Sequence, residues 1–212
     1  GPVIQRASER ALEYHVSLRD VLDMVSRFRQ MDRETPVVLM GYLNPIEVMG
    51  YENFTQQAVN AGVDGVLVVD LPPVEGQEFQ QILQQKGLDQ IYLVAPTSTT
   101  ERIQRICELS GGFVYYVSIK GVTGASHLDL KSLDEKLTQI RQSTDLPVGV
   151  GFGIKDAETA AAVSQVADAV VVGSALVSRV EALADQPDKI GATLRELLLS
   201  MRQAIDSASA ET

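Results

Sequence analysis

The chain has 212 residues, of which 45% are hydrophobic and 22% are charged, and its formal net charge is −10. These values are ordinary for a globular domain with one hydrophobic core. The acidic balance argues against a surface for nucleic acid or for an anionic membrane, because both need clusters of basic residues.

Helical patterns alternate with short apolar runs along the whole chain. It opens with an amphipathic stretch over 4–14, and Ser17 then offers an N-cap to a helix over 18–31. Continuous apolar runs, typical of parallel strands covered on both faces, predict strands over 37–40, 65–69, 91–94, 113–117, from 147 onward, and over 169–172. Helices are expected over 51–61, 76–85, 100–109, 133–142, from about 155, shortly after 173, and over 189–204, whereas 207–212 are expected to be frayed.

This alternation gives six strand–helix units, which indicates an α/β fold with a parallel sheet covered by helices. We see no linker or composition shift that would divide residues 1–212 into two domains. A closed barrel of this class has eight strands and about 250 residues. The pattern therefore fits either an open doubly wound sheet or a barrel without its first two strands.

Two successive strand-to-helix turns near the end of the chain contain glycine. The first holds Phe152 and Gly153, and the second, about twenty residues later, holds Gly173 and Ser174. Glycine leaves the backbone N–H groups uncovered, and a helix that begins there adds partial positive charge. Paired turns of this kind, placed last in a parallel barrel, are the usual phosphate site. We therefore expect a phosphorylated substrate.

The other predicted strand ends supply side chains that allow two interpretations. Asp70 is either a general base or a cap for a neighbouring loop. Lys120 is either exposed or a Schiff-base amine, and the Gly-, Thr- and Ser-rich segment 120–127 is either a surface loop or a lid over the site. Tyr42 and Tyr115 are either core residues or contacts for an aromatic substrate.

The remaining reactive residue types point to structural positions. The single cysteine, Cys107, cannot form an internal disulfide, which fits a reducing, cytoplasmic location, and its helical pattern favours a small buried side chain over a catalytic thiol. His15 and His127 lack metal-ligand spacing and are expected at the surface, so we expect no metal site. No apolar run approaches the length of a membrane span.

Five motifs, in this order and spacing, resemble the tryptophan synthase alpha chain family: Gly1-Pro2-Val3-Ile4-Gln5, Asp70-Leu71-Pro72, Ser118 with Gly121-Val122-Thr123-Gly124, Gly151-Phe152-Gly153-Ile154 and Gly173-Ser174-Ala175. The resemblance implies a (β/α)8 TIM barrel that cleaves indole-3-glycerol phosphate to indole and glyceraldehyde 3-phosphate. It also implies an alpha2beta2 complex in which indole passes to a beta chain that holds pyridoxal phosphate. No cofactor is then expected in this chain.

The resemblance assigns roles to individual positions. The substrate phosphate is expected to contact Gly124, Phe152, Gly153, Gly173 and Ser174. The indole pocket is expected to be lined by Ile4, Met40, Tyr42, Leu93 and Tyr115. The lid is expected to include Gly121 and Thr123, and the surface that faces the beta chain is expected to include Asn44, Leu71, Pro72 and Pro73.

The chain departs from the family pattern at the catalytic carboxylates. The family uses a glutamate after the second barrel strand as general acid/base and a following aspartate to hold the indole nitrogen, and both would precede Gly1. We therefore expect residues 1–212 to form a single incomplete barrel domain with about six βα units. We expect this chain alone to be inactive, because Asp70 replaces neither group, and to self-associate through the open barrel edge.

Two other functions stay open at this point. One is a non-catalytic fragment that only docks onto a beta chain and activates it, because the interface positions are present while the carboxylates are not. The other is a different phosphate-binding barrel, either an isomerase or an aldolase that forms a Schiff base through Lys120.

Overall fold

The computed structural model describes residues 1–118, 129–151 and 153–210. Within them the strands are β1 (Val38–Gly41), β2 (Gly65–Val68), β3 (Asp89–Ile91), β4 (Leu93–Val94), β5 (Val114–Val117), β6 (Val148–Gly151) and β7 (Ala169–Val171). All paired neighbours are parallel, in the orders β1-β2-β3 and β4-β5-β6-β7. This strictly sequential order is that of a barrel, because a doubly wound sheet reverses its strand order at a switch point.

The strand expected over 91–94 is divided in two. It begins at Asp89, pairs with β2 as far as Ile91, and pairs with β5 from Leu93 onward. The carbonyl of Tyr92 accepts the amide of Tyr115 at 3.1 Å, so the backbone continues between the two sheets. The expected single strand therefore changes its hydrogen-bonding partner at Tyr92.

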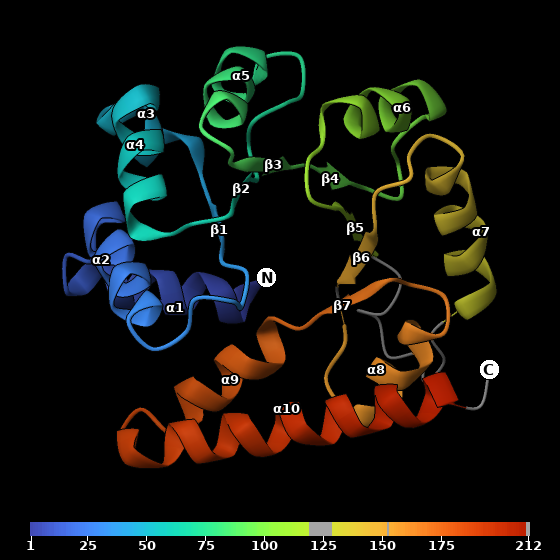
Figure 1. Ribbon diagram of the computed structural model, residues 1–212. Coiled ribbons are helices and arrows are strands. Elements are labelled where there is room, and N and C mark those ends of the chain that lie inside the picture. Colours follow the sequence, from blue (N-terminus) through green and yellow to red (C-terminus); the bar gives the residue numbers. More distant parts are fainter. Residues whose placement is uncertain (119–128, 152, 211–212) are drawn as a thin grey trace.

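The helices surround the strands (Figure 1). They are α1 (Pro2–Glu13), α2 (Leu18–Arg29), α3 (Leu43–Met49), α4 (Tyr51–Ala61), α5 (Gln77–Gln85), α6 (Thr100–Leu109), α7 (Leu130–Arg141), α8 (Ala157–Ser164), α9 (Ser174–Ala182) and α10 (Pro187–Ala210). The predicted cap of α2 is confirmed, because Ser17 and Asp20 form a reciprocal capping box. No helix in the described residues combines the length and apolarity needed to cross a bilayer.

Three helical predictions need correction. Helix α3 was not predicted, although Pro45 in its first turn is a typical start signal. Helix α7 begins three residues earlier than expected, because Asp129 caps it through the amide of Ser132. Helix α10 continues to Ala210, so residues 207–210 are helical and not frayed.

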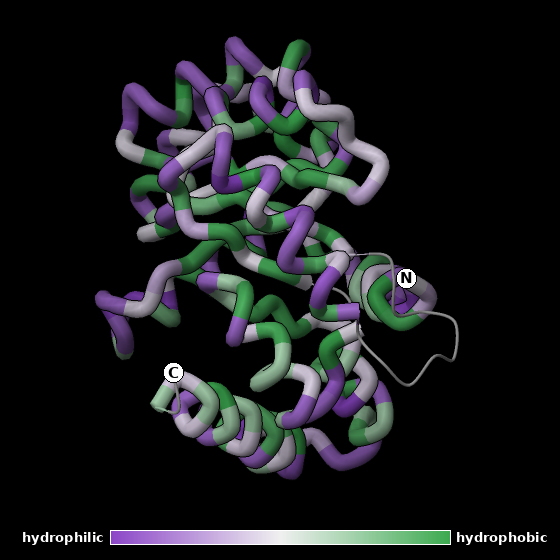
Figure 2. The backbone as a smooth tube through the Cα atoms, turned by 90° about the vertical axis from the view of Figure 1, so that its right-hand side faces the viewer, coloured by the Kyte–Doolittle hydropathy of each residue, from purple (hydrophilic) through white to green (hydrophobic). Residues whose placement is uncertain are grey.

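The outward faces of the strands and the inner faces of the helices form the core. One cluster joins β1 and β2 to α2, α4 and α5, and a second joins β4–β7 to α6, α7, α8 and α10. Apolar residues accordingly follow the strands in the middle of the molecule, whereas polar residues occupy many of the outer turns (Figure 2). Cys107 belongs to the second cluster, and burial raises the pKa of its thiol, as expected for a structural residue.

The first and last strands each pair with one neighbour in the described residues. Helices α1 and α9 pack against each other beside these two edges (Figure 1). Leu39 of β1 packs on the helical side, but Met40 points the other way and is 61% exposed. The prediction of a strand covered on both faces is therefore wrong for β1.

At the amino ends of the strands, an aspartate joins each of two neighbouring strand pairs. Asp64, which precedes β2, accepts the amide of Val37 at 2.7 Å and the guanidinium of Arg29 at 2.6 Å. Arg29 also donates to the carbonyl of Gly62 at 2.7 Å. Asp64 directly precedes β2, and its carboxylate binds the amide of Val37, which directly precedes β1. This contact fixes the register of β1 against β2.

The same arrangement recurs between β6 and β7. Asp168, which precedes β7, accepts the amide of Val148 at 2.9 Å and the guanidinium of Arg141 at 3.0 Å. Arg141 also donates to the carbonyl of Val166 at 2.9 Å, two residues before the aspartate, as Arg29 does at Gly62. We call these two groups the strand-entry clamps.

We predict that Arg29→Met lowers the free energy of unfolding by about 2–3 kcal/mol, because it removes several hydrogen bonds from a largely buried cation. Arg29 is 15% exposed and also donates to the carbonyl of Thr35 at 2.7 Å. The control is Arg105→Met, which breaks only an exposed pair with Glu108 and is expected to cost less than about 0.5 kcal/mol. Denaturant unfolding measures both, and equal losses would contradict a special role for Arg29.

Candidate functional site

Strand register brings the predicted site turns to one edge of the molecule. Val117, Gly151 and Val171 are aligned across β5, β6 and β7. The turns that follow β6 and β7 therefore lie next to each other, as the sequence predicted. Six of the predicted or considered residues lie outside the described residues: Lys120, Gly121, Thr123, Gly124, His127 and Phe152.

The turn after β6 places Gly153 in a left-handed conformation. Its φ of +75° is one that L side chains rarely adopt, so glycine is required there, and the residue is exposed. Ile154, which follows, is buried in the core cluster and anchors the turn. The backbone at Gly153 is thus exposed to solvent, while the neighbouring Ile154 holds it against the core.

Helix α9 begins directly after β7 without a side-chain cap. Its N-cap is Gly173, a Cβ there would meet no atom within 4 Å, and the exposed Ser174 is the first helical residue. The first amides of a helix have no intrahelical acceptor, so here they are free to face an anion in open space. Ala175 is buried and fixes the first turn against the core.

Helix α8 differs from α9, although the sequence predicted open amides at both. Asp156 caps α8 by accepting the amide of Thr159 at 2.9 Å, and the two residues form a capping box. Hydrogen bonds from the hydroxyl and the amide of Thr159 lower the pKa of the Asp156 carboxyl. The positive end of α8 is therefore matched by its own carboxylate, and the helix charge in this site comes from α9.

Three of the five predicted indole-pocket residues share the inner face of the strands. Met40 is in register with Ile91, which lies two residues before Leu93, and Leu93 is in register with Tyr115. Side chains two residues apart point to the same face of a strand. Burial raises the pKa of the half-buried Tyr115 phenol, which keeps it a neutral hydrogen-bonding group.

The other two pocket residues lie at the rim. Ile4 is on the first turn of α1 and is 40% exposed, and Tyr42 is the N-cap of α3 and is 66% exposed. Tyr42 is therefore not a core residue. The five predicted positions thus come from α1, β1, β4, β5 and the start of α3.

Tyr115 depends on a glycine of the neighbouring strand. A Cβ at Gly151 would lie 2.7 Å from two atoms of the Tyr115 ring, which is closer than real contacts allow. The ring of Tyr115 therefore lies against the backbone of β6. The sequence marked Gly151 only as part of a turn, whereas its structural function is to leave room for this ring.

Asp70 caps the short helix α3. Its Oδ1 accepts the amide of Leu43, the first residue of that helix, at 2.8 Å. This contact supports the capping interpretation of Asp70 and gives no geometry for a general base.

The predicted interface residues divide into exposed and buried positions. Asn44 is exposed and Pro72 is half-buried, but Leu71 and Pro73 are buried. Leu71 and Pro73 are therefore not accessible to a partner, and only the more exposed predicted residues can contact one. Two exposed apolar residues, Val48 and Val74, were not predicted as candidates for the partner surface, and they are 81% and 74% exposed. Val48 belongs to helix α3, which was not predicted.

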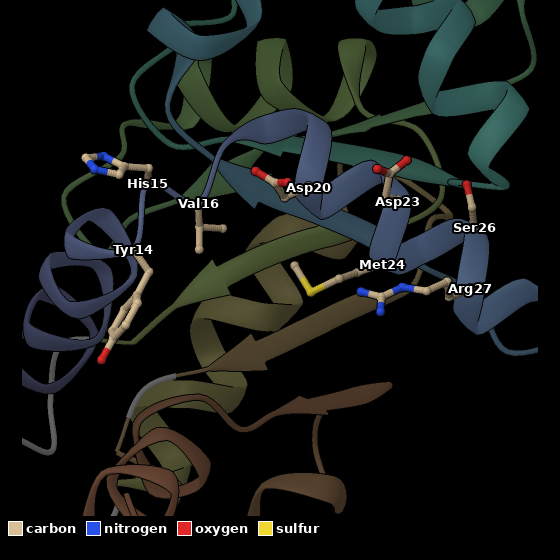
Figure 3. A pocket seen from close by; sticks show the side chains of 8 residues that line it. All are labelled: Tyr14, His15, Val16, Asp20, Asp23, Met24, Ser26 and Arg27. Carbon is tan, nitrogen blue, oxygen red and sulfur yellow. The ribbon is translucent and has the colours of Figure 1, made fainter.

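Two open hollows lie elsewhere. The first lies against the α1–α2 turn and one side of α2 (Figure 3), and it is lined by Tyr14, His15, Val16, Asp20, Asp23, Met24, Ser26 and Arg27. The second lies beside α7 and the ends of β4 and β5, and it is lined by Pro96, Tyr116, Ser118, Asp129, Ser132, Leu133, Glu135, Lys136 and Gln139. Neither contains a predicted site residue. In the described residues, no three His, Cys, Asp or Glu side chains are grouped to hold a metal ion.

Comparison with known proteins identifies one family. The family model described as tryptophan synthase alpha chain matches residues 1–206. The chain is 60% identical over 206 residues to the tryptophan synthase alpha chain of Thioalkalivibrio sulfidiphilus, covering 97% of this chain and 77% of the relative. It is 57% identical over 207 residues to that of Methylococcus capsulatus, covering 98% and 78%.

Solved structures give the same result. The crystal structure of the tryptophan synthase alpha chain from Legionella pneumophila superposes with a TM-score of 0.87 at 49% identity, covering 97% of this chain and 76% of the other. A structure of the tryptophan synthase a2b2 complex from Pyrococcus furiosus superposes with a TM-score of 0.86 at 36% identity, covering 96% and 81%.

We predict that Gly151→Ala destabilises the chain by about 1–3 kcal/mol, because the new methyl group overlaps the ring of Tyr115. Gly41→Ala is the matched control, since a Cβ at this strand glycine meets nothing within 4 Å. In a double-mutant cycle with Tyr115→Leu, the two losses should fall short of additivity by about 1 kcal/mol. Additive losses in denaturant unfolding would show that the two residues do not touch.

Proposed function

Because this chain belongs to the tryptophan synthase alpha chain family, we propose that the turns after β6 and β7 bind the phosphate of indole-3-glycerol phosphate. The alpha chain is a lyase of tryptophan biosynthesis, and it cleaves this substrate to indole and glyceraldehyde 3-phosphate by a retro-aldol reaction. Its fold is a TIM barrel, and its partner is the tryptophan synthase beta chain. We propose that residues 1–212 belong to one barrel domain, and they cover 77% of the Thioalkalivibrio sulfidiphilus relative.

The observation that carries the phosphate assignment is the uncapped start of α9 beside the left-handed Gly153. The amides at Gly173 and Ser174 and the Ser174 hydroxyl bind the phosphate oxygens, and the helix dipole adds attraction. The family resemblance also assigns Gly124 and Phe152 to this subsite and Gly121 and Thr123 to a lid, and all four lie outside the described residues.

The indole ring lies on the inner face of the strands. Met40, Leu93 and Tyr115 supply an apolar surface on that face, and Ile4 and Tyr42 cover the ring from the rim. An apolar pocket next to an anion subsite matches a substrate that is aromatic at one end and phosphorylated at the other.

Cleavage needs a proton at the indole ring carbon and removal of a proton from the glycerol hydroxyl. The glutamate and aspartate that the family uses for these tasks precede the position of Gly1 and are not among residues 1–212. Asp70 does not replace them, because its carboxylate already caps α3. Residues 1–212 alone therefore bind the substrate but leave the proton transfers unsupported.

The exposed residues Asn44, Val48 and Val74 and the half-buried Pro72 face the beta chain, and pyridoxal phosphate belongs to that partner. In the described residues β1 and β7 each pair with one strand, and edges left unpaired in a polypeptide of residues 1–212 would favour its self-association. The whole assembly works in the cytoplasm. The exposure of Val48 and Val74 also favours a second candidate function, in which a polypeptide of residues 1–212 docks onto a beta chain and activates it without catalysing a reaction itself.

We predict that Ser174→Asp weakens binding of glycerol 3-phosphate by at least about tenfold, because a carboxylate at the start of α9 occupies and repels the anion site. Ser207→Asp is the matched control, since Ser207 lies near the far end of α10 and only donates to the carbonyl of Gln203. Titration calorimetry measures both variants. Equal affinity of Ser174→Asp and the unchanged chain would contradict the phosphate assignment.

We predict that a polypeptide of residues 1–212 releases indole from indole-3-glycerol phosphate at least about 100-fold more slowly than a relative that contains both carboxylates, because a positioned proton-transfer group contributes about 10²–10⁴ in rate. Indole release is followed with and without a purified beta chain. Turnover at the rate of the relative would contradict this prediction. Faster tryptophan formation from added indole, without indole release, would identify the docking function.

A further inference from the structure

Helix α1 is held in place by an ion cluster and not by burial. Among the helices of the described residues, α1 alone has no fully buried residue. Its most enclosed positions, such as Val3 and Ala7, are only half-buried. Apolar burial supplies most of the free energy that fixes a helix on a core, so α1 needs another anchor.

That anchor is one carboxylate of α9 that binds two guanidinium groups of α1. Arg6 donates through Nε and Nη2 to the two oxygens of Glu181, each at 2.8 Å. Arg10, one helical turn later, donates through Nη1 to Oε1 of the same carboxylate at 3.0 Å. The bidentate geometry of Arg6 fixes direction as well as distance, which a single exposed ion pair does not.

The electrostatics of the cluster agree with this geometry. The hydrogen bond from Arg6, opposed by partial desolvation and aided by the charges of both arginines, lowers the pKa of Glu181 to about 2. The hydrogen bond with Glu181 raises the pKa of Arg6 in turn. The carboxylate is therefore ionised throughout the physiological range, and the three groups act as one network.

The two helices joined by this network carry opposite ends of the proposed site. Helix α9 starts with Ser174 at the phosphate subsite, and its buried Ala175 and its packing against α10 hold it independently of α1. Helix α1 carries Ile4 in its first turn, at the rim of the indole pocket. Loss of the network would thus release the indole end and leave the phosphate end in place.

We propose that Arg6, Arg10 and Glu181 are positioning residues for the substrate, because they fix α1 so that Ile4 covers the indole ring. This inference rests on the proposed function. It specifies that recognition of the ring depends on a surface ion cluster, whereas recognition of the phosphate does not.

The test compares two ligands in the same variants by titration calorimetry. Glu181→Gln is expected to weaken binding of indole-3-glycerol phosphate roughly tenfold and to leave binding of glycerol 3-phosphate unchanged. The control is Asp206→Asn, which breaks the exposed Arg202–Asp206 pair on α10 and touches neither α1 nor α9. An equal loss for both ligands, or no loss for either, would overturn the positioning role.

A charge-reversed variant separates the ion cluster from general damage to α9. The triple change Arg6→Glu, Arg10→Glu and Glu181→Arg keeps opposite charges on the two helices and is expected to recover most of the affinity for indole-3-glycerol phosphate. Failure to recover it, with a normally folded chain, would overturn the inference.

Hydrogen exchange distinguishes this inference from the proposed function. The amides of α1 should exchange faster in Glu181→Gln, whereas those of α9 should not change. If the unchanged chain binds no glycerol 3-phosphate, the proposed function fails, and the exchange of α1 still reports on the ion cluster. Unchanged exchange of α1 in Glu181→Gln would overturn the anchoring role itself.

Discussion

Parallel strands need an external device to set their register, and the two strand-entry clamps provide it here. Antiparallel neighbours can be aligned by a short turn, but parallel neighbours are separated by a whole helical connection. Asp64 binds the amide of the residue just before β1, and Asp168 binds the first amide of β6. Arg29 and Arg141 tie each aspartate to the end of the helix that precedes β1 or β6. Every position at the other ends of these strands follows from this alignment, since each strand holds only three or four residues.

Strand register determines which residues come together in the proposed site. With β6 and β7 in register, the turn at Gly153 and the start of α9 follow neighbouring strand ends, which supports the proposal that one phosphate contacts both. In the pair β5 and β6, which neither clamp joins, a slip of one residue would send Tyr115 to the helical side and would remove it from Gly151, whose missing side chain accommodates its ring. The proposed phosphate subsite thus depends on the register of β6 and β7, and the proposed indole pocket depends on the register of β5 and β6.

Much of this arrangement follows from local sequence patterns, and the parts that do not are tertiary. Continuous apolar runs located the strands, and the cap residue Ser17 marks a helix start that the structure confirms. The glycine-containing turns indicated a phosphate site, but the sequence did not reveal that Asp156 closes one of the two helix ends. Helix α3 escaped prediction because its cap, Asp70, lies 27 residues away in the chain. The exposure of Met40 is also a tertiary property, because it depends on which elements pack against β1, and an apolar run in the sequence does not specify them.

The two ends of the proposed substrate site are anchored by different kinds of interaction. The phosphate end rests on buried residues, Ile154 and Ala175, whose removal from water stabilises the turns whatever the ionic strength. The ring end rests partly on α1, which hydrogen-bonded charges at the surface hold against α9. Salt screens exposed charges but hardly affects apolar burial. Rising ionic strength should therefore loosen α1, while Ile154 and Ala175 keep the turns of the phosphate end in place, although salt also screens the attraction between the start of α9 and the phosphate.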